Sequence, residues 1–282
     1  MNPYQKFVSD FARLLTEGKS LPLGGFPPPK KTPSQSGAPP VLIFSPHPDD
    51  ECVNGGLALR LMREAGARIV NVPVTLGSNP ERRAARLREV KAACDWIGFE
   101  LADGGLEKIS PATRTNEPEV WIAAVKAIVA LLAAHQPRAI FFPHGLDWNT
   151  THVGAHHLVM DALKSLPADF TTLLIETEFW GQMPAPNLMV ELSAEDVADL
   201  VAALSFHIGE VQRNPYHLRL PALLQDNVRR GAELVGGQGS VAPDFAFAAL
   251  YRVRKWEGSH VKEIYTGGKQ IGAKEPAGSV LG

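Results

Sequence analysis

Short apolar runs alternate with amphipathic segments through most of the chain. The apolar or β-rich runs of strand length cover 41–45, 68–77, 138–143 and 171–179. Between them, apolar residues recur at helical spacing, which predicts helices over 55–66, 81–98, 120–135 and 152–165. Strands that alternate with helices in this way form βαβ units. We therefore expect an α/β fold, a Rossmann-like three-layer sandwich with a mostly parallel sheet.

The N-terminal 40 residues have a different pattern. Residues 1–19 predict an amphipathic helix, and the residues on its apolar face are Phe7, Phe11, Leu14 and Leu15. Residues 20–40 are rich in Pro, Gly and Ser, which is typical of a linker or a surface arm. We therefore predict a helix and an arm over residues 1–40 and a single domain over 41–282.

The C-terminal third is less regular. Residues 193–211 begin with a Ser and an acidic turn, as a capped helix does, and residues 224–237 also predict a helix. Residues 213–221 contain two prolines and predict an extended or turning segment. Residues 245–256 alternate in a way that fits either a strand or a helix.

Composition narrows the classes of function. With 282 residues the chain is long enough to bury a core without disulfides. A net charge of −2 shows no basic excess, so we expect no nucleic-acid partner and no anionic membrane. No run approaches the ~20 apolar residues of a membrane span, and residues 1–19 lack the features of a signal peptide. Two cysteines, Cys52 and Cys94, make no disulfide framework, so we expect a cytoplasmic protein.

The stretch 44-FSPHPDDECVNGG-56 places unusual chemistry at the end of the first predicted strand. His47 and Asp50 are three residues apart on a turn, a spacing that lets both side chains reach one point, as ligands of a zinc ion do. Asp49 lies between them and could take a proton from the attacking water. Glu51 is better suited to orient His47 or to bond the backbone. Alternatively, these acids only cap a helix.

A third ligand is expected from 147-DWNTTHVGAHH-157, which follows the strand predicted at 138–143. The carboxyl ends of parallel strands share one edge of the sheet, where ligands bind in such folds. His152, at the start of the next helix, is the candidate, although a His there can also be a simple cap. Two strand-end loops of one sheet each carry His and Asp, and this combination favours a metal site over simple helix caps.

These motifs resemble the zinc-dependent PIG-L (LmbE-like) N-acetylglucosaminyl deacetylases. The resemblance rests on PHPDDE with a following GG, an R-x-x-E helix and a D-x-N-x-x-H segment, and it extends from about residue 40 to about residue 250. The segments RNPYHLRLP and DNVRRGAELVGGQG resemble a bacterial branch that acts on small amino sugars. The resemblance implies one Zn²⁺ per chain held by His47, Asp50 and His152, with Asp49 as general base and Arg86 as a substrate contact.

The second motif departs from the family pattern. Many members have His-x-Asp-His there, whereas this chain has Asn149 and Thr151 at the first and third positions. The general acid must then come from elsewhere. His144 and His217 are the first candidates, either of which can instead be structural, and His207 and His260 follow. Asp49 could also return the proton itself.

We expect the substrate to be a soluble N-acetylglucosamine or a short chito-oligosaccharide such as diacetylchitobiose, from which acetate is released. Candidate sugar contacts, besides Arg86, are Asp103, Asp147, Trp148 and Arg213. The alternatives are a deacylase of another amide, such as a thiol-linked glucosaminide or an antibiotic intermediate, and a non-catalytic sugar-binding module. The lack of GxGxxG argues against a dinucleotide. The N-terminal helix and arm could pack on a neighbouring subunit, so a homo-oligomer is possible.

Overall fold

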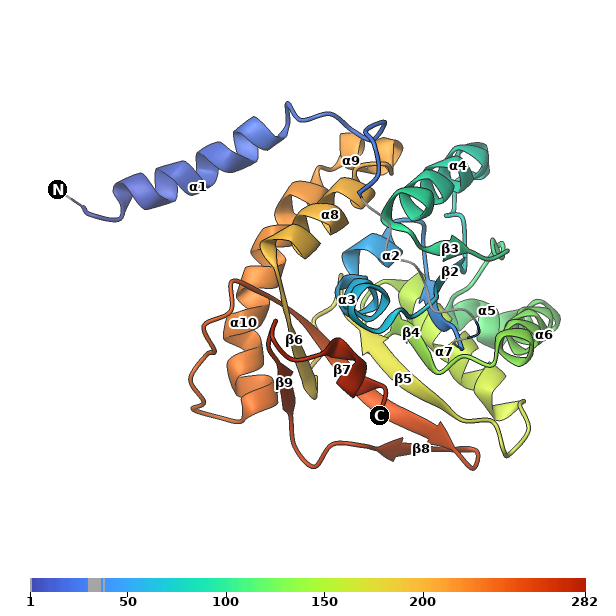
Figure 1. Ribbon diagram of the computed structural model, residues 1–282. Helices are drawn as coiled ribbons and strands as arrows, with labels where there is room; N and C mark the ends of the chain where they lie inside the picture. The colour runs from blue at the N-terminus through green and yellow to red at the C-terminus, as the bar shows by residue number, and fades with distance from the viewer. Residues whose placement is uncertain (1, 30–36, 38) are drawn as a thin grey trace.

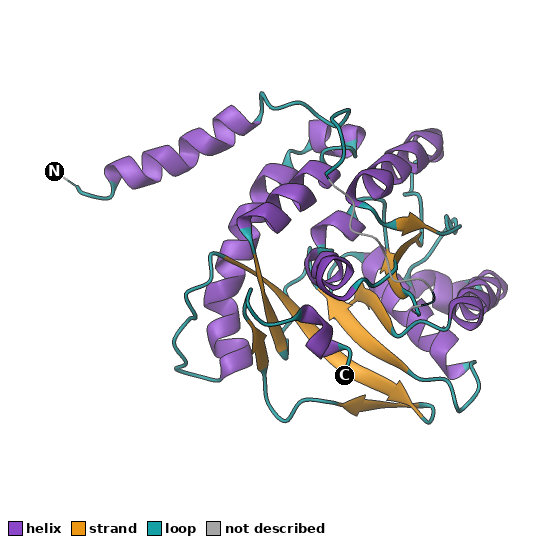
Figure 2. Cartoon of the chain, in the orientation of Figure 1, coloured by secondary structure: helices purple, strands orange, loops and turns teal. Residues whose placement is uncertain are grey.

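The computed structural model describes residues 2–29, 37 and 39–282, and shows helices on both faces of a twisted sheet (Figures 1 and 2). The strands are β1 Val41–Ser45, β2 Ile69–Pro73, β3 Glu100–Leu101, β4 Ala139–Pro143, β5 Thr172–Thr177, β6 Leu188–Leu192, β7 Phe247–Glu257, β8 His260–Glu263 and β9 Lys269–Ile271. The helices are α1 Gln5–Gly18, α2 Asp50–Val53, α3 Gly56–Ala65, α4 Pro80–Ile97, α5 Pro111–Asn116, α6 Pro118–His135, α7 Thr150–Lys164, α8 Ala194–Leu204, α9 Ile208–Arg213 and α10 Leu220–Gly236, with 3₁₀ turns η1 Tyr216–Arg219 and η2 Ala277–Val280.

The strand order is β3-β2-β1-β4-β5-β7-β6-β9, with β8 paired to β7. Strands β3 to β5 are parallel, whereas β7 runs antiparallel to both β5 and β6. The predicted mostly parallel α/β sheet is therefore confirmed. The chain moves outward from β1 to β2 and β3, then returns to place β4 on the other side of β1. The strand order thus reverses between β1 and β4, and ligands bind at such a reversal point in α/β sheets.

The strand β1 contributes side chains to two hydrophobic cores, because successive side chains of a strand point to opposite faces of the sheet. Val41 and Ile43 pack with α3, α4 and α8 on one face. Leu42 and Phe44 pack with α6 and α7 on the other. All five residues of β1 are buried, which explains why the sequence there reads as a continuous apolar run.

Parts of the C-terminal third differ from the prediction. The helix expected over 193–211 is interrupted at 205–207 and continues as α9. The ambiguous segment 245–256 is the strand β7, which lies inside the sheet between β5 and β6. The segment 213–221 includes the 3₁₀ turn η1. The strands β3, β8 and β9 have only two to four residues, too few to carry a recognisable period.

The N-terminal helix is present as α1, which extends away from the body of the molecule (Figure 1). Part of the predicted arm lies on the body: Phe26 packs edge-on against Trp96, with ring centroids 5.5 Å apart, and the Trp96 indole donates to the Pro27 carbonyl at 3.0 Å. Residues 30–36 and 38 of the arm lie outside the described residues.

By length and composition, α6 would suffice to cross a membrane, with a mean hydropathy of 1.5 over its 18 residues. In this fold it forms part of the outer layer. Trp121, Ile128 and Leu132 are buried on its inner face and belong to the core on that side of the sheet. Buried residues make up 22% of this helix. The prediction that no run approaches the length of a membrane span did not anticipate it.

Candidate active site

The two motif loops meet at the point where the strand order reverses. The turn after β1 carries His47 and Asp50, and the helix α7, which follows the loop after β4, carries His152 in its first turn. The Asp50 Oδ2 atom lies 3.6 Å from His47 Nδ1 and 3.4 Å from His152 Nε2. One ligand atom from each of the three residues lies within 4.8 Å of the other two. The three predicted ligands therefore share one centre.

The surroundings of this centre fit a divalent metal ion. Asp50 and His152 are 2% and 1% exposed, and His152 Nε2 is buried without a hydrogen-bond partner among the described residues. A buried polar atom without a partner is costly unless a ligand satisfies it. Two imidazole nitrogens and one carboxylate oxygen are a donor set that zinc takes when one position stays open.

Asp147 and Asn149 both lie against His152. Asp147 was expected to contact substrate, but its Oδ2 atom lies 3.4 Å from His152 Nδ1, the ring nitrogen that faces away from Asp50. Burial alone would lower the pKa of His152, but the charges of Asp50 and Asp147 outweigh it and raise that pKa. Asn149 caps α7, because its Oδ1 accepts from the backbone N–H of Thr151 at 3.0 Å. Asn149, one of the two departures from the family pattern, is thus a helix cap.

The backbone of Asp49 is held in an unusual conformation. Its φ is 123°, a region that residues with a side chain rarely adopt. The Asp49 N–H donates to Glu51 Oε2 at 2.9 Å, and the other oxygen of Glu51 lies 2.7 Å from His207 Nε2. Glu51 and His207 are both fully buried. Glu51 therefore bonds the backbone, which was one of its two expected roles. Its other carboxylate oxygen bonds His207.

The carboxylate of Asp49 has two further neighbours. The Tyr216 hydroxyl donates to Asp49 Oδ2 at 2.5 Å, and Arg86 Nη2 lies 3.7 Å from the same oxygen. Burial raises the pKa of Asp49 to about 7, helped by the charge of Asp50 and opposed by His207, Arg86 and Tyr216. A carboxyl group that titrates near neutrality is suited to general-base work.

Arg86 was expected to contact substrate, but it also buttresses the motif turn. Its Nη2 donates to the Pro48 carbonyl at 3.0 Å, and it packs so closely on Gly77 that a Cβ there would lie 2.3 Å from its Nη1. Gly77 has a φ of +88°, which also favours glycine. The guanidinium is thus fixed between the first-motif turn and the loop after β2.

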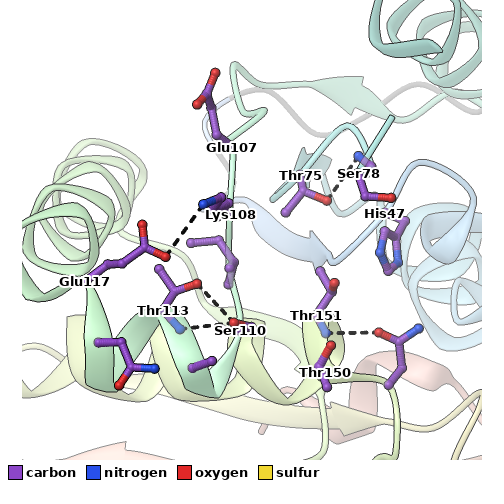
Figure 3. A pocket seen from close by; sticks show the side chains of 15 residues that line it. His47, Thr75, Ser78, Glu107, Lys108, Ser110, Thr113, Glu117, Thr150 and Thr151 are labelled. Carbon is purple, nitrogen blue, oxygen red and sulfur yellow. Dashed lines mark hydrogen bonds and ion pairs between the residues drawn. The ribbon is translucent and has the colours of Figure 1, made fainter. Parts of the chain in front are cut away.

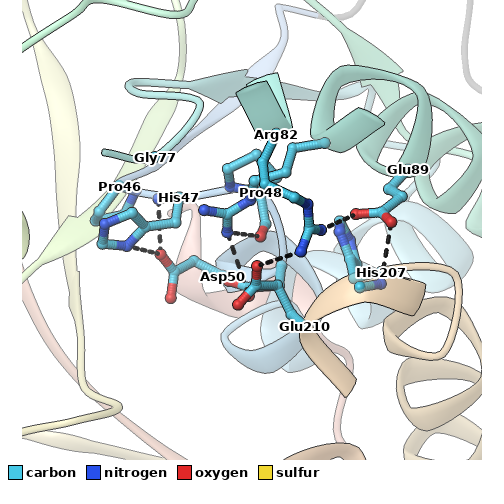
Figure 4. A network of polar contacts seen from close by, with 12 residues as sticks. Pro46, His47, Pro48, Asp50, Gly77, Arg82, Glu89, His207 and Glu210 are labelled. Atoms are coloured by element: carbon cyan, nitrogen blue, oxygen red, sulfur yellow. Dashed lines mark hydrogen bonds and ion pairs between the residues drawn. The ribbon is translucent and has the colours of Figure 1, made fainter. Parts of the chain in front are cut away.

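Ion pairs tie α4 to the segment that carries Tyr216. Arg82 lies between Glu89 and Glu210, 3.6 Å from a carboxylate oxygen of each (Figure 4). Glu89 also accepts from the Gly209 N–H at 3.0 Å. Because Glu210 and Gly209 belong to α9, these contacts hold the chain that leads into η1 over the motif turn. They position Tyr216 although it is far from Asp49 in the sequence.

A polar cavity of about 540 Å³ opens beside His47 (Figure 3). Its lining includes the side chains of Thr75, Ser78, Ser110, Thr113, Asn116, Asn149, Thr150 and Thr151. At its outer side, Lys108 lies 3.7 Å from Glu117. Hydroxyl and amide groups of this kind suit a ligand with several hydroxyls.

The two candidate general acids lie in different settings. His144 is buried, with Nε2 2.9 Å from the Gly181 carbonyl and Nδ1 accepting from the Leu146 N–H at 3.3 Å, so both ring nitrogens bond the loop backbone. His217 is buried on η1, and burial lowers its pKa. It is its neighbour Tyr216 that reaches Asp49. Among the described residues, neither the His144 nor the His217 imidazole belongs to the cluster of His47, Asp50 and His152.

The remaining sugar-contact candidates lie at the surface. Trp148 is 69% exposed, and its indole donates to the Trp180 carbonyl at 3.2 Å. Arg213 pairs with Glu210 at 2.6 Å. Asp103 is exposed on the loop after β3 and is not among the described residues that line the polar cavity.

Tyr216 was missed by the sequence reasoning, and His207 was not assigned this role. Tyr216 stands next to His217 in the RNPYHLRLP segment, whose resemblance to a bacterial branch was the only available signal. A tyrosine within a proline-flanked turn has no spacing relation to the HPDDE turn. Only the packing of α9 and η1 reveals its partner.

Comparison with known proteins gives a family match over part of the chain and a fold. Residues 42–163, which include both motif loops, match the family described as PIG-L: GlcNAc-PI de-N-acetylase. No match to a curated protein is found.

Solved structures similar to this chain include N,N'-diacetylchitobiose deacetylase from Pyrococcus horikoshii, at 15% identity and a TM-score of 0.57, covering 92% of this chain and 96% of that one. GalB, the 4-carboxy-2-hydroxymuconate hydratase of Pseudomonas putida KT2440, has 15% identity and a TM-score of 0.58, covering 76% and 95%. The zinc-inhibited form of teicoplanin deacetylase Orf2 has 13% identity and a TM-score of 0.56, covering 77% and 97%. At these identities the likeness establishes the fold.

Proposed function

We propose that this chain, whose residues 42–163 match the PIG-L family, is a zinc-dependent hydrolase that removes the acetyl group from an N-acetylglucosamine-type sugar. The observation that carries the proposal is the His47–Asp50–His152 cluster, with Asp49 next to Asp50 in the chain and close enough for the charge of Asp50 to raise its pKa. Three ligands leave room for the reaction on a zinc ion, and a carboxylate with a pKa of about 7 stands next to it. The polar cavity beside His47 suits a sugar ring.

The residues of the chain have distinct tasks in this reaction. Zinc, when bound, would activate water and polarise the acetyl carbonyl. Asp49 accepts the proton of the attacking water, and its place is fixed by Glu51 at the backbone and Tyr216 at the carboxylate. Asp49 then delivers that proton to the leaving nitrogen, since C–N cleavage requires a protonated amine. This assignment gives the general-acid step to Asp49 in place of His144 or His217.

Within the substrate class, N-acetylglucosamine and diacetylchitobiose are the specific candidates. The match to a family of de-N-acetylases and the likeness to diacetylchitobiose deacetylase support them. The similar hydratase GalB acts on an acidic compound. Lys108 is the one Lys or Arg side chain in the described lining of the polar cavity, and it is paired with Glu117. This pairing does not favour a substrate with several carboxylates.

The test is acetate and free-amine release from N-acetylglucosamine and diacetylchitobiose by the zinc-loaded protein. Asp49→Asn should keep the metal and lose roughly 10²–10⁴-fold in rate. Asp169→Asn makes the same chemical change at an exposed carboxylate outside the cavity lining, and its rate should stay at the wild-type level. No release from any acetylated amino sugar, or an Asp49→Asn variant with full activity, would contradict the proposal.

A further inference from the structure

The helix α1 presents a broad apolar face to solvent. Tyr4 just before it and Phe7, Val8, Phe11 and Leu14 within it are 71%, 67%, 62%, 49% and 60% exposed. These residues recur at intervals of three and four, so they form one stripe along the helix. An isolated 14-residue helix is marginal in water, and its stability comes from packing such a face.

Only the last turn of α1 is anchored on the body. Gly18 is buried, and a Cβ there would lie 2.9 Å from Leu218 of η1. The rest of the helix extends outward past α8 and α9 (Figure 1). The position of α1 is therefore defined at its root, while its exposed stripe has no cover among the described residues.

An apolar groove of about 440 Å³ lies where α1 meets the body. Phe11 and Leu14 of α1 form one wall, and Leu218, Val201 and Phe247 are among the body residues that line it. The apolar stripe of α1 thus continues into a concave apolar surface of the same molecule. One chain carries both a ridge and a groove of matching chemistry, which is what a self-complementary two-fold interface requires.

We propose that this surface binds a second copy of the chain, with the α1 stripe of each copy lying in the groove of the other. An antiparallel arrangement would set Tyr4, Phe7 and Val8 of one copy against Phe11 and Leu14 of its partner. The interface would bury on the order of 100 Å² of surface for each exposed aromatic ring and roughly 600 Å² for the whole stripe. With the groove included, this approaches the ~800 Å² per partner of a stable interface.

The charges of α1 favour a protein partner over a membrane. Lys6 pairs with Asp10, and Arg13 lies 2.8 Å from Glu17, so the polar face is balanced. Helices that lie on membranes carry an excess of Lys and Arg on that face. A balanced polar face has no attraction for anionic lipid headgroups.

The mass of the full chain in solution, measured by light scattering after gel filtration, tests the proposal. We expect twice the 30.5 kDa chain mass. Phe7→Glu on the ridge and Ala222→Glu, at an exposed residue that lines the groove, should each give monomers. Ser9→Glu adds the same charge at an exposed polar position of α1 and should leave the dimer intact. Circular dichroism should show that the monomeric variants remain folded.

Three results would overturn the inference. The wild-type chain could be monomeric, whether or not it sediments with vesicles of phosphatidylcholine and phosphatidylserine. It could instead form oligomers whose mass Phe7→Glu and Ala222→Glu leave unchanged. Finally, Ser9→Glu could dissociate the dimer as fully as Phe7→Glu. None of these results bears on the proposed deacetylation, because the assay does not use activity.

Discussion

Replacing Tyr216 by Phe removes one hydroxyl group and leaves the ring in place. The lost contact is the 2.5 Å hydrogen bond to Asp49 Oδ2. A hydrogen bond to a charged group contributes roughly 1.5–3 kcal/mol. One decade in rate corresponds to about 1.4 kcal/mol, so kcat for deacetylation should fall about 10- to 150-fold if the bond fixes the base in the transition state.

The assay compares kcat and KM for acetate release, with zinc content measured on the same samples. Tyr216 acts through Asp49, so kcat should fall while KM and zinc content stay close to wild type. Tyr265→Phe is the matched control, because the Tyr265 hydroxyl is buried without a hydrogen-bond partner in the described part of the chain. A Tyr216→Phe enzyme with wild-type kcat, or one altered only in KM, would refute the positioning of the base by this tyrosine.

Three further changes probe the second motif and the core. Asp147→Asn should weaken zinc binding about 10–100-fold in a chelator competition, because it removes the carboxylate that orients His152; unchanged affinity would refute that role. Burial lowers the pKa of His156 to about 4, below its unfolded value of about 6.5, so its stability contribution is complete above pH ~6.5 and is lost towards pH 4. The free energy of unfolding in urea should therefore fall by up to about 3 kcal/mol between pH ~6.5 and pH 4, and this part of the fall should be absent in His156→Asn. An equal fall in the variant would exclude His156 as its source. Glu178→Gln leaves the buried Arg230 guanidinium without its carboxylate and should cost about 3–5 kcal/mol in urea unfolding, whereas a cost below about 1 kcal/mol would show that Arg230 finds another partner.

The fold was readable from the sequence wherever burial is uniform along an element. β1 and β4 are buried along their whole length, so their apolar runs identify them directly. The strand β7 was ambiguous because its exposed and buried positions do not follow a strict period of two. Its neighbours β5 and β6 in the sheet, rather than its own residues, make it a strand.

The sequence by itself predicted the three residues of the candidate metal centre. His47 and Asp50 share one turn, and His152 follows a strand that lies parallel to β1, so local spacing and the shared sheet edge were enough. Only the tertiary structure decided what surrounds Asp49. Tyr216 and His207 lie 167 and 156 residues from their partners Asp49 and Glu51. Contacts over such separations depend on how α8, α9 and η1 pack across the motif turn, and no local periodicity in the chain encodes that packing.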